Sequence, residues 1–219
     1  MRIRNKPWAA EELNKCPYFI RNPENHIGKW HGFFKKEQPV YLELGCGKGF
    51  FLAAAAVQNP NINFLGIDIK DAVLGPAKRN IDKAFADAKK EPLNIIITAL
   101  NIEQILNYFG PSDSVSRIYI NFCNPWPKKK HQKRRLTYPK QLNHYKSILE
   151  PGGEIFFKTD DDGLFEDSIV YFNECGFEIT YKTYDLHSEK QIPDIMTEHE
   201  IMFSEKGIKI KALAAKLKV

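Results

Sequence analysis

Residues 40–49, VYLELGCGKG, join a short apolar run to three closely spaced glycines. The apolar run has the length of a buried strand, and helical spacing follows it at residues 50–57. Glycines between a strand and a helix let the backbone approach a ligand closely, and the helix then presents free N–H groups. This stretch therefore predicts a ligand-binding turn at the carboxyl end of the first strand of an α/β sheet.

The remainder of the chain repeats this order of strand and helix. Further strand-like runs lie at residues 62–69, 94–100, 117–123, 153–159, 177–186 and 200–211. Helical spacing lies between several of them, at residues 71–89, 138–149 and 164–175. Alternation of this kind predicts a doubly wound, mostly parallel, Rossmann-like sheet of seven strands. We expect the last two runs to form an antiparallel edge.

Residues 1–38 are only weakly periodic. They contain Arg2, Arg4 and Lys6 and a short helical pattern near residues 10–15. We expect a basic N-terminal arm with a short helix over residues 1–38, followed by one domain over residues 39–219. Such an arm is suited to ordering on a nucleic acid.

The composition is that of a soluble globular protein. Of 219 residues, 43% are hydrophobic and 27% are charged, which excludes a disordered or fibrous chain. The cysteines form no CxxC pair, so we expect reduced thiols, no metal site and a cytoplasmic location; they are Cys16, Cys46, Cys123 and Cys175. No apolar run approaches the ~18 residues of a membrane span. The sequence leaves open whether the protein is a monomer or a homodimer.

The positive charge is concentrated in one segment. Residues 114–149 contain nine Lys and Arg residues and no Asp or Glu, whereas the other residues contain 23 basic and 27 acidic side chains. The protein is therefore mildly acidic apart from one strongly basic segment, and this asymmetry indicates a polyanionic partner.

Two acidic residues at consecutive strand ends indicate the kind of cofactor. Glu43 precedes Gly45 and Gly47, and Asp68 ends the next strand. A carboxylate at Glu43 disfavours a pyrophosphate but suits a cationic amino-acid ligand, and Asp68 can accept hydrogen bonds from ribose hydroxyls. The pair favours S-adenosylmethionine over a nicotinamide dinucleotide, although each motif alone also fits a tight turn and a surface aspartate.

The basic segment begins at a rigid aromatic loop. Residues 121–127, NFCNPWP, follow the fourth strand-like run, at the sheet edge where α/β proteins bind ligands. Two prolines and a tryptophan suit the stacking of a planar base. The run KKKHQKRR follows directly, at residues 128–135. Because it adjoins a loop suited to stacking a base, we interpret it as a surface that contacts RNA phosphates rather than as a solvated charged loop.

Several of these motifs together resemble one enzyme family. ELGCGKG, GID, NFCNPWPKKKHQKRRLTYP, FKTDD and TEHEIMFSEKG are similar in order and spacing to the bacterial tRNA (guanine-N7-)-methyltransferases, from about residue 4 to residue 207. The resemblance implies transfer of a methyl group from S-adenosylmethionine to N7 of a guanine, position 46 of the tRNA variable loop. It implies cofactor contacts at Glu43, Gly45, Gly47, Asp68, Asn101 and Asn124, catalytic roles for Asn124 and Asp160, and substrate contacts at Lys128, Asp160, Thr197, Glu198, His199 and Glu200. The expected phosphate contacts are Lys129, Lys130, Lys133, Arg134 and Arg135.

The chain departs from the family at two positions, because Asn124 and Asn101 stand where an aspartate is frequent. Guanine N7 carries a free lone pair, so its methylation needs no general base. An amide oxygen can still accept a hydrogen bond, and we expect Asn124 to orient groups rather than to accept a proton.

Asp160, Asp161 and Asp162 follow the strand-like run at residues 153–159. We expect Asp160 to accept from the Watson–Crick edge of the guanine and Asp162 to cap the next helix.

Two other functions stay open: a methyltransferase for small molecules, and an RNA-binding protein that has lost catalysis. The basic segment argues against the first, and Asn124 is compatible with the second.

Overall fold

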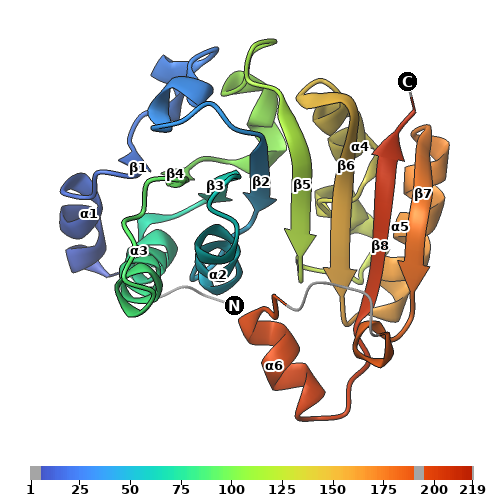
Figure 1. Cartoon of the computed structure of the whole chain (residues 1–219). Coiled ribbons are helices and arrows are strands. Elements are labelled where there is room, and N and C mark those ends of the chain that lie inside the picture. The colour runs from blue at the N-terminus through green and yellow to red at the C-terminus, as the bar shows by residue number, and fades with distance from the viewer. Residues whose placement is uncertain (1–5, 190–194, 219) are drawn as a thin grey trace. The chain divides into compact units, whose positions relative to one another are not determined.

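The computed structural model describes residues 6–189 and 195–218. The chain divides into two compact units, residues 1–113 and 114–219. Each unit combines strands and covering helices, and Figure 1 shows both. The predicted boundary near residue 38 stays a prediction.

The first unit contains four parallel strands in the order β1-β4-β3-β2. The strands are β1 (Phe19–Ile20), β2 (Val40–Leu44), β3 (Asn63–Asp68) and β4 (Ile95–Ala99). Leu44 pairs with Ile67, and Asp68 pairs with Ala99, so the carboxyl ends of β2, β3 and β4 meet at one edge. The apolar runs predicted from the sequence form these strands, because residues such as Leu42 and Leu65 are completely buried.

Three helices accompany these strands: α1 (Pro7–Asn14), α2 (Phe50–Gln58) and α3 (Asp71–Asp87). Short 3₁₀ helices lie at Pro23–His26, Trp30–Phe33 and Ile102–Asn107. The helix α2 begins immediately after the glycine-rich turn, as the sequence predicts. Apolar residues of α3 at helical spacing, among them Leu74, Ala77 and Ile81, are completely buried.

The N-terminal residues add a strand that the sequence analysis did not predict. The short helix expected near residues 10–15 is α1, and β1 then pairs with β4. The Tyr18 hydroxyl donates to Asp82 on α3 at 2.5 Å, and Arg21 pairs with Asp71 at 2.8 Å. Such contacts join this segment to α3, and with β1 the described residues contain eight strands where seven were expected. Arg2 and Arg4 of the expected arm lie outside the described residues.

The second unit contains the strands β5, β6, β8 and β7, in that order. The strands β5 and β6 are parallel, and β8 is antiparallel to both β6 and β7. The mostly parallel sheet with an antiparallel edge is therefore confirmed. The elements are β5 (Val115–Asn121), α4 (Pro139–Lys146), β6 (Leu149–Thr159), α5 (Asp162–Glu174), β7 (Phe177–Thr183), α6 (Glu198–Ser204) and β8 (Lys211–Leu217), with 3₁₀ helices at Lys129–Arg134 and Leu186–Ser188.

The strand predicted at residues 200–211 is wrong. Residues 198–204 form the helix α6, and the last strand, β8, begins at Lys211. The Thr197 hydroxyl accepts from the Glu200 N–H at 3.0 Å, and the Glu200 carboxylate accepts from the Thr197 N–H at 2.8 Å. This capping box starts a helix, and its threonine and glutamate at the required spacing are visible in the sequence.

No helix in the described part of the chain is long and apolar enough to cross a membrane. Within residues 6–189 and 195–218, no group of three or more His, Cys, Asp or Glu side chains is arranged to hold a metal ion.

Candidate functional site

The glycine-rich turn of the first unit leaves open space beside its backbone. Gly45 and Gly47 have φ values of +79° and +54°, which residues other than glycine adopt only at a cost in free energy. A Cβ atom added at Gly45 would meet no atom within 4 Å, and one at Gly47 would reach only the Gly45 carbonyl oxygen, at 4.0 Å. A ligand can therefore approach this part of the backbone directly.

Asp68, at the end of β3, is fixed against this turn. Its carboxylate accepts from the Gly47 N–H at 3.0 Å and from the Ile69 N–H at 2.7 Å. Burial raises the pKa of Asp68 above its ordinary value, whereas the two N–H donors lower it. The side chain is half-buried, so part of the carboxylate is available to a ligand.

Glu43 and Cys46 complete the polar groups around the turn. Glu43 lies near the end of β2 and is 3% exposed. Burial raises the pKa of the Cys46 thiol well above its usual range, and the charges of Glu43 and Asp68 raise it further. The thiol is therefore neutral, and the structure brings Glu43 and Asp68 to the same turn. A cationic ligand with hydroxyl donors fits this set of groups.

Asn101 follows β4 at the same edge of the first unit. Its side-chain oxygen accepts from the Glu103 N–H at 3.0 Å, which caps the 3₁₀ helix Ile102–Asn107. The side chain is only partly exposed, and its amide nitrogen is the group left to face a ligand.

The loop after β5 in the second unit carries Asn124 on its surface. The Asn124 side-chain oxygen accepts from the Trp126 N–H at 3.2 Å. The Trp126 ring lies 5.7 Å from the His131 ring, and the Arg134 guanidinium lies 5.1 Å from the Trp126 ring centre. Burial raises the pKa of the neighbouring Cys123 thiol to about 12, so this cysteine is not a nucleophile at neutral pH.

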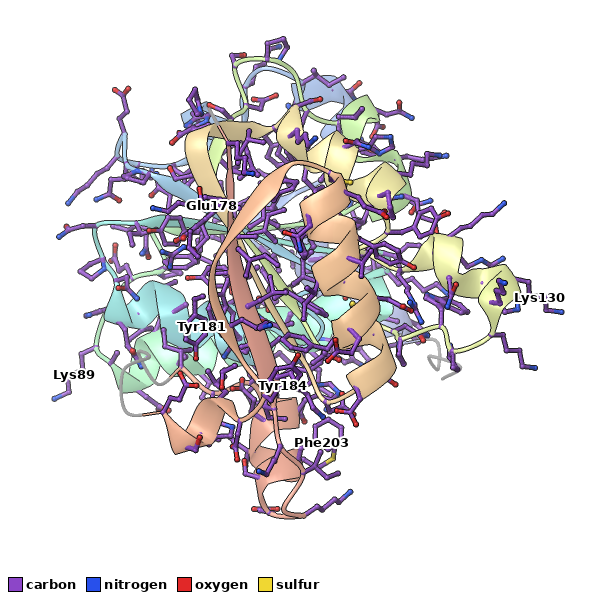
Figure 2. The ribbon with its side chains drawn as sticks, turned by 90° about the vertical axis from the view of Figure 1, so that its right-hand side faces the viewer. Lys89, Lys130, Glu178, Tyr181, Tyr184 and Phe203 are labelled. Carbon is purple, nitrogen blue, oxygen red and sulfur yellow. The ribbon has the colours of Figure 1, made fainter. Side chains whose placement is uncertain are left out.

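Most of the basic run extends into solvent from the 3₁₀ helix that follows this loop. Lys128, which precedes the helix, is exposed, as are Lys129, Lys130, Lys133 and Arg134. Figure 2 shows Lys130 projecting away from the ribbon. These side chains are accessible to a polyanion.

Arg135 departs from this pattern, and its expected phosphate contact needs correction. The residue is 3% exposed, and its guanidinium bonds to the Pro125 carbonyl and to Asp167. A buried guanidinium with protein partners is not available to an RNA phosphate.

The helix cap expected at Asp162 is wrong, whereas the guanine contact expected at Asp160 stays a prediction. The Asp160 carboxylate is half-buried, and the residue's backbone carbonyl accepts from Lys211 at 3.0 Å. Asp161, not Asp162, caps α5, since its carboxylate accepts from the Leu164 N–H at 2.7 Å. Asp162 instead pairs with Lys211 at 2.6 Å. The helix begins at Asp162 rather than at residue 164, and its cap is therefore Asp161.

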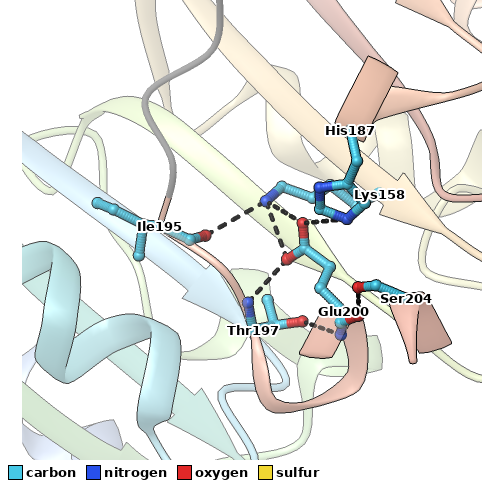
Figure 3. Close-up of polar contacts among 6 residues, drawn as sticks. All are labelled: Lys158, His187, Ile195, Thr197, Glu200 and Ser204. Carbon is cyan, nitrogen blue, oxygen red and sulfur yellow. Dashed lines mark hydrogen bonds and ion pairs between the residues drawn. The ribbon is translucent and has the colours of Figure 1, made fainter. Parts of the chain in front are cut away.

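The start of α6 is fastened to β6 by a buried ion pair (Figure 3). The Lys158 ammonium lies 3.1 Å from both carboxylate oxygens of Glu200, and their side chains are 5% and 2% exposed. The ammonium also faces the Ile195 carbonyl at 3.5 Å, and His187 lies 3.9 Å from Glu200. Glu200 is therefore committed to contacts within the protein. Sequence reasoning missed Lys158, although a lysine within the apolar run of β6 was a visible signal.

The other residues of the substrate segment, residues 197–200, are placed differently from Glu200. Thr197 is buried as the helix cap, and Glu198 is exposed. His199 is exposed and stacks on Phe122, which follows β5, with ring centres 5.6 Å apart and an angle of 16°. This stacking joins α6 to the loop that carries Asn124.

Comparison with known proteins gives a consistent picture. Residues 37–213 match the family model described as "Putative methyltransferase". A tRNA (guanine-N7-)-methyltransferase of Clostridium beijerinckii is 57% identical over 215 residues, which cover 98% of each chain. One of Clostridium perfringens strain 13 is 54% identical over 217 residues, 99% of each chain.

Solved structures support the fold. An antibiotic-related methyltransferase has a TM-score of 0.62 at 15% identity, covering 94% of this chain and 98% of its own. The 16S rRNA methyltransferase KamB has a TM-score of 0.61 at 14% identity, covering 99% of this chain and 95% of its own. At such low identity, the similarity extends to the fold alone.

Proposed function

Because this chain belongs to the family of tRNA (guanine-N7-)-methyltransferases, we propose that it transfers a methyl group from S-adenosylmethionine to N7 of a guanine in tRNA. The observation that carries this proposal is the identity above 50% across nearly the whole of both chains. It includes both the glycine-rich turn and the basic segment, so the cofactor and the RNA are supported together.

The first unit supplies the residues that fit the cofactor. The turn at Gly45 and Gly47 leaves room for a ligand, Glu43 matches a cationic amino-acid group, and Asp68 can accept from ribose hydroxyls. We assign Asn101 to a further polar contact with it. S-adenosylmethionine, when bound there, supplies a methyl group on a positively charged sulfur.

The second unit supplies the residues that handle the base and the RNA backbone. Guanine N7 carries a free lone pair, so its methylation needs no general base. Asn124 therefore orients the reacting groups and does not accept a proton. The Asp160 carboxylate is the acceptor for the guanine N1–H and amino group. Glu198 and His199, exposed at the start of α6, are the members of the substrate segment that can contact the base.

The exposed part of the basic run contacts tRNA phosphates. Lys128, Lys129, Lys130, Lys133 and Arg134 carry these contacts, and they supply affinity without reading sequence. We place the reaction in the cytoplasm, where tRNA is available, and whether the protein acts as a monomer or a homodimer stays open.

A methyl-transfer assay on defined tRNA tests the proposal. Labelled methyl groups should appear in a tRNA transcript with guanine at position 46 of the variable loop, and alkali-sensitive cleavage should map to that guanine. A matched transcript with adenine at that position should remain at background. Binding of tRNA without any methyl transfer would favour the non-catalytic RNA-binding protein instead.

A further inference from the structure

Arg135 ends the basic run but is buried, unlike the lysines before it. Within residues 128–135, all of which the structure describes, it is the one side chain classed as buried, at 3% exposure. Burying a guanidinium is costly unless its donors are paired within the protein. The position of Arg135 thus depends on specific partners.

Those partners lie on two separate elements of the second unit. The Nε atom donates to the Pro125 carbonyl at 2.7 Å, and an Nη atom donates to the Asp167 carboxylate at 2.5 Å. Pro125 directly follows Asn124 in the loop after β5, and Asp167 lies on α5. The planar guanidinium donates from two separate nitrogens held at a fixed spacing, which the single nitrogen of a lysine does not offer.

The loop that Arg135 contacts has a strained backbone. Phe122 and Trp126 have φ values of +50° and +43°, in the left-handed region that L residues rarely adopt. Such conformations persist where the surrounding structure holds them. Within the loop, the Asn124 side chain accepts from the Trp126 N–H, and Arg135 adds a second restraint from outside.

We propose that Arg135 is a positioning residue, which bridges the Pro125 carbonyl to Asp167 and so holds Asn124 and Trp126 in their geometry. It acts on methyl transfer through the loop and does not bind RNA phosphate. The inference rests on the proposed function, since Asn124 is the residue whose placement matters. An error of about 1 Å in a positioned group can cost 10²-fold in rate.

The test compares Arg135→Gln and Arg135→Lys with Lys133→Gln, an exposed neighbour that loses the same charge as Arg135→Gln. We expect both Arg135 variants to lower kcat at saturating tRNA by about 10- to 100-fold. Their tRNA dissociation constant and its salt dependence should stay within about twofold of the parent. Lys133→Gln should instead weaken tRNA binding and flatten its salt dependence by somewhat under one unit of log–log slope.

Asp167→Asn tests the bridge from its more exposed end, where the side chain is 43% exposed and folding is less at risk. It should lower kcat in the same direction, and combining it with Arg135→Gln should add little. Thermal unfolding of each variant reports whether the fold is retained.

Two results would overturn the proposal. One is an Arg135→Gln variant that binds tRNA as weakly as Lys133→Gln does while keeping its kcat. The other is a folded Asp167→Asn variant with unchanged kcat. Failure of the proposed function is distinguishable from both, because the parent protein would then transfer no methyl group to tRNA.

Discussion

Asp68 and Glu43 lie at the same turn but are held differently. Two backbone N–H groups fix the Asp68 carboxylate in one orientation, whereas Glu43 is almost completely buried near the end of β2. An acceptor fixed before binding loses little freedom when the ligand arrives. We therefore expect protonation of Asp68 to have the largest effect on the affinity for the cofactor.

Affinity for S-adenosylmethionine should fall on acidification as Asp68 takes up a proton. Burial raises its pKa above 3.8, so the loss should begin at a higher pH than for an ordinary aspartate. Asp68→Asn should weaken binding by ~1.5–3 kcal/mol at neutral pH, because a charged acceptor is lost. Calorimetric titrations across pH measure both effects.

Glu43→Gln is the matched control for this pH dependence. It should weaken binding but retain the acid-dependent step that Asp68→Asn removes. An identical pH profile in the parent and in Asp68→Asn would assign that step to another group.

Asn124 tests whether the reaction needs an orienting group or a proton acceptor. Asn124→Asp should leave kcat within about tenfold, or ~1.4 kcal/mol in the barrier, because an acceptor oxygen remains. Asn124→Ala should cost considerably more, since it also removes the bond to the Trp126 N–H. Single-turnover methyl transfer measures the difference. A gain of several orders of magnitude in the Asp variant would show that the parent is an impaired enzyme.

At the scale of elements, the placement of α6 depends on one buried charge pair. Lys158 comes from β6 and Glu200 from α6, and the same carboxylate also completes the capping box with Thr197. One side chain thus both starts the helix and fastens it to the sheet. The His199 ring of this helix also stacks on Phe122, at the start of the loop that carries Asn124.

Lys158→Met should destabilise the protein by ~3–5 kcal/mol, because it leaves the Glu200 carboxylate buried without its ammonium partner. Adding Glu200→Gln should recover part of this loss, since the uncompensated charge is removed. Denaturant unfolding gives these free energies. Lys209→Met is the control: its ion pair with Asp185 is exposed, so its loss should cost less than about 1 kcal/mol. Equal costs in the two lysine variants would contradict a structural role for the buried pair.

At the scale of the whole molecule, the excess of positive charge lies in one segment. All nine basic residues of the segment 114–149 belong to the second unit, and the rest of the chain carries net negative charge. A surface of this kind attracts RNA through release of its counterions, which makes binding strongly dependent on salt.

Neutralising Lys133 and Arg134 together should lower tRNA affinity and reduce the log–log salt slope by somewhat under two units. Lys182→Gln removes an exposed charge outside the basic segment and should leave the slope unchanged. Binding isotherms at several salt concentrations measure both. An unchanged slope in the double variant would mean that this part of the run is a solvated loop.

The sequence by itself determined most of the order of strands and helices and the position of the glycine-rich turn. These features depend on neighbours within a few residues, such as apolar periodicity and glycine spacing, so local patterns carry them. The capping box at Thr197 is equally local. The sequence therefore contained the signal for a helix at residues 198–204, where a strand from residue 200 was predicted wrongly. The strand β1 lacked a local pattern, because two residues are too few for one.

Only the tertiary structure decided which charged residues face solvent. Arg135 and Lys133 look alike in the sequence, but Arg135 finds Asp167, 32 residues further along the chain, and is buried. Glu200 looked like a residue for binding substrate, but Lys158, 42 residues earlier, occupies both of its carboxylate oxygens. A charged side chain can be buried only where a partner offsets its desolvation, and that partner is brought close by folding rather than by sequence.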